Sequence, residues 1–105
     1  MVANDLSVVM DRSDDRTELR IAGEIDASNA DELDAYFDAA SAPGPKEIVV
    51  DLSALTFTSS SGLSALVRNR HRVDPSINIV IVRPSSHIRR LLQIAAIDDL
   101  FDIRE

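Results

Sequence analysis

Residues 49–63 read Val-Val-Asp-Leu-Ser-Ala-Leu-Thr-Phe-Thr-Ser-Ser-Ser-Gly-Leu. In this stretch an apolar run ends in a turn with three consecutive serines and a glycine, and apolar residues then recur at helical spacing. The pattern predicts a strand, a turn and a helix, with small hydroxyls where free backbone N–H groups and the positive end of the helix dipole meet solvent. A serine at that position is easy for another protein to reach. A phosphate added to it would change the local charge abruptly.

Several segments have the composition of strands. Apolar and polar residues alternate over residues 6–10 and 19–25, which predicts two half-buried strands joined by a hairpin turn at Asp14-Asp15-Arg16. Residues 48–52 and 77–82 are almost continuously apolar, which is typical of central strands covered on both faces. Residues 98–103 are expected to form a short turn or helix followed by a last extended piece.

Three segments have apolar residues at helical spacing. The first helix begins near Ala30 after a predicted capping box of Ser28 and Asp31, and it ends at Pro43. The second begins near Ser60 and ends in a cationic segment, Arg68 to Arg72, which is expected to be a solvated end matched to the helix dipole. The third starts at Ser85-Ser86. The residues predicted to be buried are Leu33, Phe37 and Ala40 in the first helix, Leu63, Leu66 and Val67 in the second, and Ile88, Leu91, Leu92 and Ala95 in the third.

Strands that alternate with helices predict right-handed crossovers onto a mostly parallel sheet, to which the opening hairpin adds an antiparallel strand. The fold class predicted from the sequence is therefore α/β, with a mixed sheet of four to five strands and three to four helices. The chain has 105 residues, which is enough for one modest core, so residues 1–105 are expected to form a single domain.

Composition narrows the classes of function. The net charge is −7, with 13 acids and 4 bases in residues 1–52 against 5 acids and 7 bases in residues 53–105. An acidic chain with 4 % aromatic residues is a poor candidate for nucleic acid binding, because that affinity depends on phosphate neutralisation. No apolar run is long enough to cross a bilayer, and no signal peptide precedes Asp5, so a cytoplasmic protein without direct membrane insertion is expected.

The residues do not predict an enzyme. Neither Gly-x-Ser-x-Gly nor Ser-x-x-Lys occurs at the three serines, His71 is expected several turns along the same helix, and His87 begins another. The sequence has no cysteine, no pair of histidines at metal-binding spacing and no glycine-rich nucleotide motif. A binding module without a metal or a cofactor is therefore expected.

Several motifs together resemble those of the STAS domain family, the fold of bacterial anti-sigma factor antagonists. The segment at residues 51–63 resembles the family's strand followed by Asp-Ser-Ser-Gly-Leu, and Gly23-Glu24-Ile25-Asp26 with the helical run at residues 29–33 resembles its first strand-to-helix signature. Residues 85–92 and 98–103 resemble its last helix and closing segment. The resemblance covers nearly all of the chain.

The resemblance implies a function in transcription regulation and the stress response. An antagonist of this family binds a serine-kinase-type anti-sigma factor and so releases a sigma factor; phosphorylation by that kinase ends the binding, and a phosphatase restores it. Ser60 falls on the phosphorylated serine, with Ser61 on the second serine and Gly62 on the glycine that allows close backbone approach. The surface implied to bind the partner comprises Glu24, Asp26, Thr58, Ser59, Ser60, Ser61 and Gly62.

One position departs from the family pattern. The aspartate that usually precedes the phosphorylated serine is Ser59 here. A serine still caps a helix, so the fold should survive the change, but kinase recognition is altered and Ser59 or Ser61 become alternative acceptors. This departure leaves open a second function, a cytoplasmic STAS subunit of a lipid-trafficking ABC transport complex without a phosphorylation cycle. A third is a ligand-sensing or scaffold module, which is less expected because residues 1–105 predict no separate sensor domain.

Overall fold

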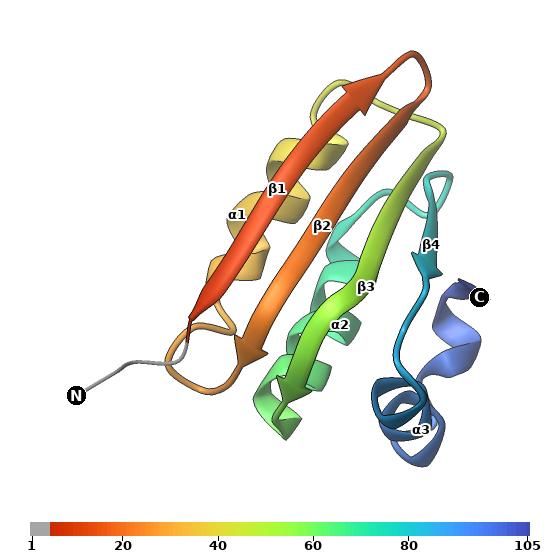
Figure 1. The fold of residues 1–105 in the computed structure, drawn as a ribbon. Helices are drawn as coiled ribbons and strands as arrows, with labels where there is room; N and C mark the ends of the chain where they lie inside the picture. Colours follow the sequence, from red (N-terminus) through yellow and green to blue (C-terminus); the bar gives the residue numbers. More distant parts are fainter. Residues whose placement is uncertain (1–4) are drawn as a thin grey trace.

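The structure is a computed structural model that describes residues 5–105. The strands are β1 (Leu6–Ser13), β2 (Arg16–Ile25), β3 (Glu47–Thr58), β4 (Asn78–Val82) and β5 (Asp102–Arg104). The helices are α1 (Glu32–Ser41), α2 (Ser60–Arg72), α3 (Ser86–Ile94) and the 3₁₀ turn η1 (Asp98–Leu100) (Figure 1). Residues 1–4, which belong to the predicted domain, lie outside the described residues.

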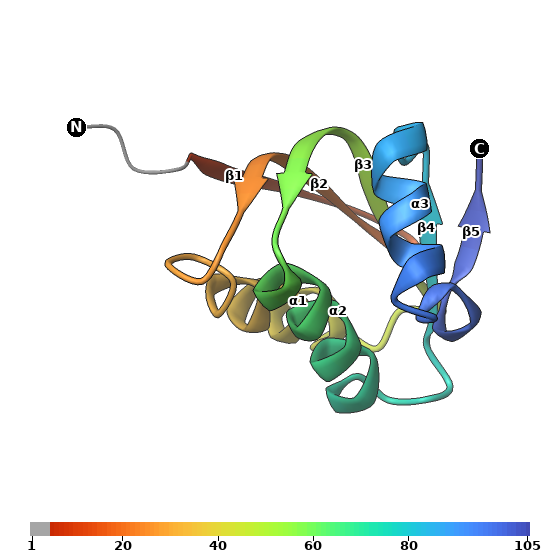
Figure 2. The ribbon, with the colours of Figure 1, turned by 90° about the horizontal axis from the view of Figure 1, so that it is seen from below.

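The strands form one sheet in the order β1-β2-β3-β4-β5, in which β1 and β2 are antiparallel and every other pair is parallel. This arrangement confirms the predicted α/β class and the mixed, mostly parallel sheet. Helices α1 and α2 lie beside each other under one face of the sheet, and α3 lies toward β4 and β5 (Figure 2). The carboxyl ends of β2 and β3 therefore lie side by side, where β2 continues toward α1 and β3 enters α2.

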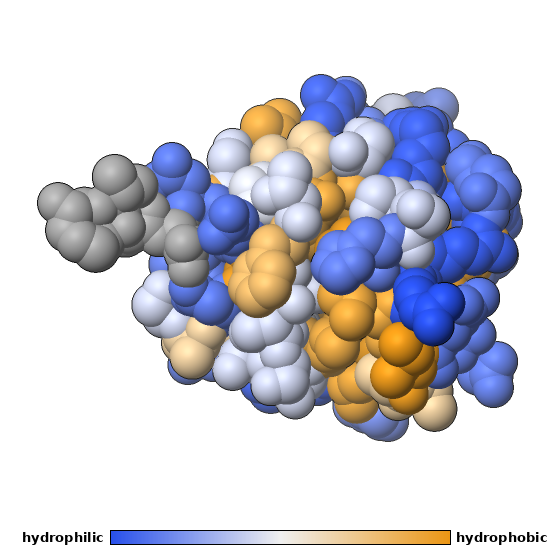
Figure 3. Space-filling model, turned by 60° about the horizontal axis from the view of Figure 1, so that its bottom comes forward, coloured by the Kyte–Doolittle hydropathy of each residue, from blue (hydrophilic) through white to orange (hydrophobic). Residues whose placement is uncertain are grey.

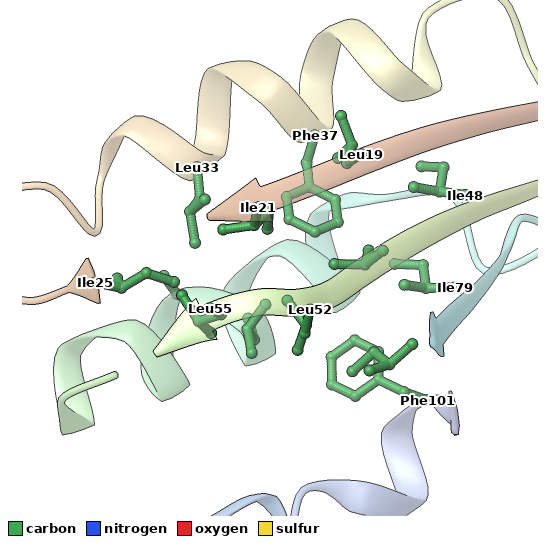
Figure 4. Close-up of a cluster of buried hydrophobic side chains, with 14 of the residues drawn as sticks. Leu19, Ile21, Ile25, Leu33, Phe37, Ile48, Leu52, Leu55, Ile79 and Phe101 are labelled. Carbon is green, nitrogen blue, oxygen red and sulfur yellow. The ribbon is translucent and has the colours of Figure 1, made fainter. Parts of the chain in front are cut away.

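The core lies between the sheet and the helices. Phe37 of α1 packs close to Leu19 and Ile21 of β2, while Leu52 of β3 and Phe101 lie on the side of α3 (Figure 4). Burying one such side chain completely stabilises the fold by roughly 1.5–3 kcal/mol. The predicted central strand at residues 48–52 is confirmed, because its residues 48–52 are all buried and it pairs on both edges.

Four residues predicted to be buried are not fully buried. Leu63 and Val67 of α2 and Leu91 of α3 are half-buried, and Ala95 is exposed. The prediction was wrong because helical spacing shows that residues share a face but not how much of that face is covered. Here Leu63 and Val67 of α2 and Ala95 at the end of α3 line an open groove.

The predicted capping box at the first helix is also wrong. Helix α1 begins at Glu32, and no side chain caps it. Ser28 instead donates hydrogen bonds from its N–H and its Oγ to Oδ1 of Asp26, at 2.9 and 2.6 Å. The hydroxyl of Ser28 donates to the carboxylate two residues earlier and does not accept from a backbone N–H of the helix, so this serine closes a turn before the helix begins.

The arginines at the end of α2 are not simply solvated, which corrects the prediction for two of them. Arg68 contacts Asp34 of α1 at 3.0 Å, and Arg72 contacts Asp38 at 2.8 Å. Between them the fully buried Asn69 donates to Asp34 at 2.9 Å. Hydrogen bonds from Arg68 lower the pKa of Asp34. These contacts join α1 to α2 along the side of the helix pair.

Candidate functional site

The serine loop, residues 58–62, lies at the carboxyl edge of the sheet. Ile25 pairs with Thr58 in parallel register, and the backbone N–H of Ser59 donates to the carbonyl of Ile25 at 2.9 Å. The turn after β2 is therefore held against the turn after β3. In open α/β sheets this edge is where ligands and partners usually bind, because the loops that follow parallel strands meet there.

The three serines of the loop have different surroundings. Ser59 is the N-cap of α2, and its Oγ accepts a hydrogen bond from the N–H of Ser61 at 3.2 Å. Ser61 is half-buried, whereas Ser60 is exposed at the first position of the helix. Ser60 is thus the most accessible of the three hydroxyls, and it lies where a helix N-terminus favours a negative charge.

Thr58 and Gly62 lie beneath the loop and shape it from inside. Thr58 is 4 % exposed, and its Oγ1 donates to the carbonyl of Ser59 at 3.1 Å. A Cβ on Gly62 would lie 2.1 Å from Oγ1 of Thr58 and 2.8 Å from Cγ2 of Ile25. Glycine at this position therefore lets the first turn of α2 sit directly on the ends of β2 and β3. Both of these predicted site residues are buried beneath the exposed part of the loop.

Glu24 and Asp26 lie next to the serine loop, as the sequence predicted. The register of β2 with β3 shifts after Gly23. This position requires glycine for two reasons: its φ is +96°, and a Cβ here would lie 2.1 Å from the carbonyl oxygen of Asp5. The buried Asn29 holds the following turn, since its Nδ2 donates to the carbonyl of Glu24 at 3.0 Å and its Oδ1 accepts from the N–H of Asp26 at 2.9 Å. Sequence reasoning missed this asparagine.

Hydrogen bonds in this turn favour the ionised form of the Asp26 carboxyl group. The hydroxyl of Ser28 donates to Asp26, and together with backbone N–H groups it lowers the pKa of that carboxyl group. At neutral pH the turn therefore presents a carboxylate beside the serine loop. The edge carries a reachable hydroxyl, Ser60, next to negative charge from the β2 turn.

An apolar groove begins at the serine loop and runs between α2 and the end of α3. Its volume is about 430 Å³, and its lining residues are Ser60, Leu63, Ser64, Val67, Arg68, Ala95 and Ile97. Apolar side chains gather in a patch on this face of the molecule (Figure 3). Sequence reasoning missed the groove, because it assigned Leu63, Val67 and Ala95 to the core.

The groove is not the only apolar feature near the loop. Phe57, which pairs with Glu24 across the two strands, is 41 % exposed.

Among the described residues, no cluster of three or more histidines and acids could hold a metal ion. Nor is any helix of residues 5–105 long and apolar enough to cross a membrane.

Comparisons with known proteins agree on one family. The model of the STAS domain family matches residues 7–105. The anti-sigma-F factor antagonist RsfB of Mycobacterium tuberculosis is 32 % identical over 83 residues, which cover 79 % of this chain and 68 % of that protein. That relative is an antagonist of an anti-sigma factor.

Solved structures share the fold over almost the whole chain. An anti-sigma factor antagonist from Mycobacterium paratuberculosis superposes with a TM-score of 0.79 at 25 % identity, covering 95 % of this chain and 86 % of that one. SpoIIAA of Bacillus, solved in a phosphorylated form, superposes with a TM-score of 0.63 at 19 % identity, covering 96 % and 90 %. At that identity the second likeness concerns the fold alone.

Proposed function

The chain belongs to the STAS domain family, and from this premise we propose that it is an anti-sigma factor antagonist regulated by phosphorylation at Ser60. In its unmodified state it binds a serine-kinase-type anti-sigma factor in the cytoplasm and so frees a sigma factor. Phosphorylation by that kinase ends the binding, and a phosphatase restores it. The relatives named above are antagonists of anti-sigma factors, which supports the general function.

The observation that carries the phosphorylation proposal is the position of Ser60. Its side chain is exposed at the first position of α2, while Ser59 caps the helix and Ser61 is half-buried. A phosphate there adds a charge of about −1.5 to −2, which the positive end of the α2 helix dipole favours. A partner that covers the loop must desolvate that charge, so the modification opposes binding and leaves the fold intact.

The surface proposed to contact the partner consists of the exposed and half-exposed residues of this edge. They are Glu24 and Asp26 from the β2 turn, Ser59, Ser60 and Ser61 from the loop, and Ser64 from the exposed face of α2. Thr58 and Gly62 support this surface from beneath. Ser59 caps the helix as the usual aspartate would. We therefore expect the change from aspartate to serine to affect kinase recognition and not the shape of the loop.

The test is a pull-down from the lysate of the native organism with the wild type, Ser60→Ala and Ser60→Glu, identified by mass spectrometry. Ser86→Glu is a matched control, because Ser86 is also exposed at the first position of a helix capped by a serine. We expect an anti-sigma factor of the kinase type with the wild type, Ser60→Ala and Ser86→Glu. Recovery with Ser60→Glu should fall at least tenfold, which corresponds to ~1.4 kcal/mol.

The serine at position 59, where the family usually has an aspartate, favours one alternative function. A cytoplasmic STAS subunit of a lipid-trafficking ABC transport complex uses the same helix surface without a phosphorylation cycle. Equal recovery of transporter subunits by all four proteins would support that function and reject the phosphorylation proposal.

A further inference from the structure

Of the groove between α2 and the end of α3, only Ser60 and Ser64 belong to the docking surface described so far. Its floor and walls are mostly apolar, from Leu63 and Val67 on α2 and from Ala95 and Ile97 after α3. We propose that this groove receives an apolar side chain of the anti-sigma factor, which extends the docking surface from the serine loop to the end of α3. This inference rests on the proposed function.

The charges of the lining residues favour an uncharged occupant. Arg68 is the one charged residue among the described residues that line the groove. Its guanidinium is already paired, at 3.0 Å with Asp34 and at 3.3 Å with Asp31. An anionic small molecule would therefore find no free cation in the groove. An apolar side chain needs none, and it gains stability from the apolar area that it covers.

The backbone at the end of α3 fixes the second wall. The N–H of Ile97 donates to the carbonyl of Leu92 and that of Ala96 to the carbonyl of Gln93, a Schellman closure with Ala96 at φ +59°. Ala96, which has a Cβ, therefore adopts the left-handed backbone conformation that glycine usually occupies. The turn places Ala95 and Ile97 at the groove and leaves Ile94, beside them in sequence, 69 % exposed.

The groove is continuous with the serine loop, because Ser60 lines both. A partner that covers Ser60 therefore lies over the mouth of the groove. A phosphate on Ser60 would place a dianion at that mouth. An apolar side chain that entered the groove would remove water from this dianion without replacing its hydrogen bonds, so the phosphate would oppose entry. Phosphorylation of Ser60 would therefore weaken the proposed contact of the partner with both α2 and the end of α3.

Two substitutions by arginine test the two walls of the groove separately. Ser64→Arg lies on the α2 wall, which the proposed function already includes, whereas Ala95→Arg lies on the α3 wall, which only this inference includes. Both residues are exposed, and Ala95 has ordinary helical backbone, so neither change should disturb the fold. Gln93→Arg is the matched control, since Gln93 is also exposed and near the end of α3 but does not line the groove.

The binding constants are measured by calorimetry with the purified anti-sigma factor identified in the pull-down, and thermal unfolding checks each variant's fold. We expect Ala95→Arg to raise the Kd at least tenfold and Gln93→Arg to change it less than twofold. If Ala95→Arg binds like the wild type while Ser60→Glu does not bind, the groove inference is overturned and the proposed function stands. If the wild type itself binds no anti-sigma factor, both are overturned.

Discussion

Replacing Gly62 by alanine should destabilise the protein, although alanine is the better helix former. The added Cβ would lie 2.1 Å from Oγ1 of Thr58, 2.8 Å from Cγ2 of Ile25 and 3.1 Å from its Cβ. Both neighbours belong to strand ends that are buried and paired with each other. Neither can move far, so the first turn of α2 must move away from the sheet.

The magnitude follows from two opposing effects. Overpacking a buried contact costs typically ~1–3 kcal/mol. Alanine in place of glycine returns at most ~1 kcal/mol of helix propensity, and less in the first turn than in a helix interior. The free energy of unfolding should therefore fall by about 1–2 kcal/mol. In a domain of this size each kcal/mol lowers Tm by roughly 4–8 °C.

The assay is urea unfolding of the wild type, Gly62→Ala, Thr58→Ala and the double variant. Thr58→Ala removes the Oγ1 that meets the new Cβ, so Gly62→Ala should cost at least ~0.5 kcal/mol less in that background. The contact with Ile25 persists, so the rescue should be partial. Ser64→Ala, at an exposed position of the same helix, reports the propensity gain without a clash.

The reasoning would be refuted if Gly62→Ala unfolded at the same urea concentration as the wild type or at a higher one. A cost that is equal in both Thr58 backgrounds would also contradict it, because the close contact would then not be the cause. Binding of the anti-sigma factor by Gly62→Ala, measured well below its Tm, should weaken, since the turn that moves carries Ser60.

Two further predictions concern single side chains. Ser59→Ala removes the hydroxyl that accepts from the N–H of Ser61 and should lower the free energy of unfolding by about 0.5–2 kcal/mol. Ser59→Asp should retain the cap. Equal losses of stability for the two variants in urea unfolding would argue against capping. Burial alone would raise the pKa of Asp51, but the N–H of Ser53 and the guanidinium of Arg83, 2.6 Å away, lower it below its ordinary value of 3.8. A carboxyl group whose pKa is lowered by folding stabilises the protein above its unfolded pKa and loses that effect as the pH falls through the folded pKa. The urea midpoint should therefore drop more between pH 5 and about pH 2 in the wild type than in Asp51→Asn, and parallel curves would contradict this.

Local patterns predicted most of the secondary structure. Alternation identified β1 and β2, and the continuous apolar run at residues 48–52 identified a central strand. The N-cap of α2 was predictable because a cap depends on a few adjacent residues, and Ser59 occupies it. The same logic failed at α1, where the hydroxyl of Ser28 donates to Asp26 and does not accept from a backbone N–H of the helix.

The candidate site was predictable only in part. Parallel pairing of β2 and β3 was inferred from the alternation of strands and helices, and the resemblance to a known family pointed to Glu24, Asp26 and the serine loop. That Thr58 is buried and Ser60 is exposed could not be read from a run of similar small residues. Exposure depends on which side of the loop faces Ile25, and that residue is 33 positions away from Thr58 in the chain.

By itself the sequence determined the elements, their order and the hydroxyl-rich turn, because periodicity, capping and turn formation act between residues close in the chain. The tertiary structure decided what depends on distant segments. It turned the predicted cationic end of α2 into ion pairs with α1, and it left Leu63 and Val67 lining a groove whose other wall comes from Ala95 and Ile97. Helical spacing predicts that apolar residues share a face, but only packing determines whether that face is covered or remains open to a partner.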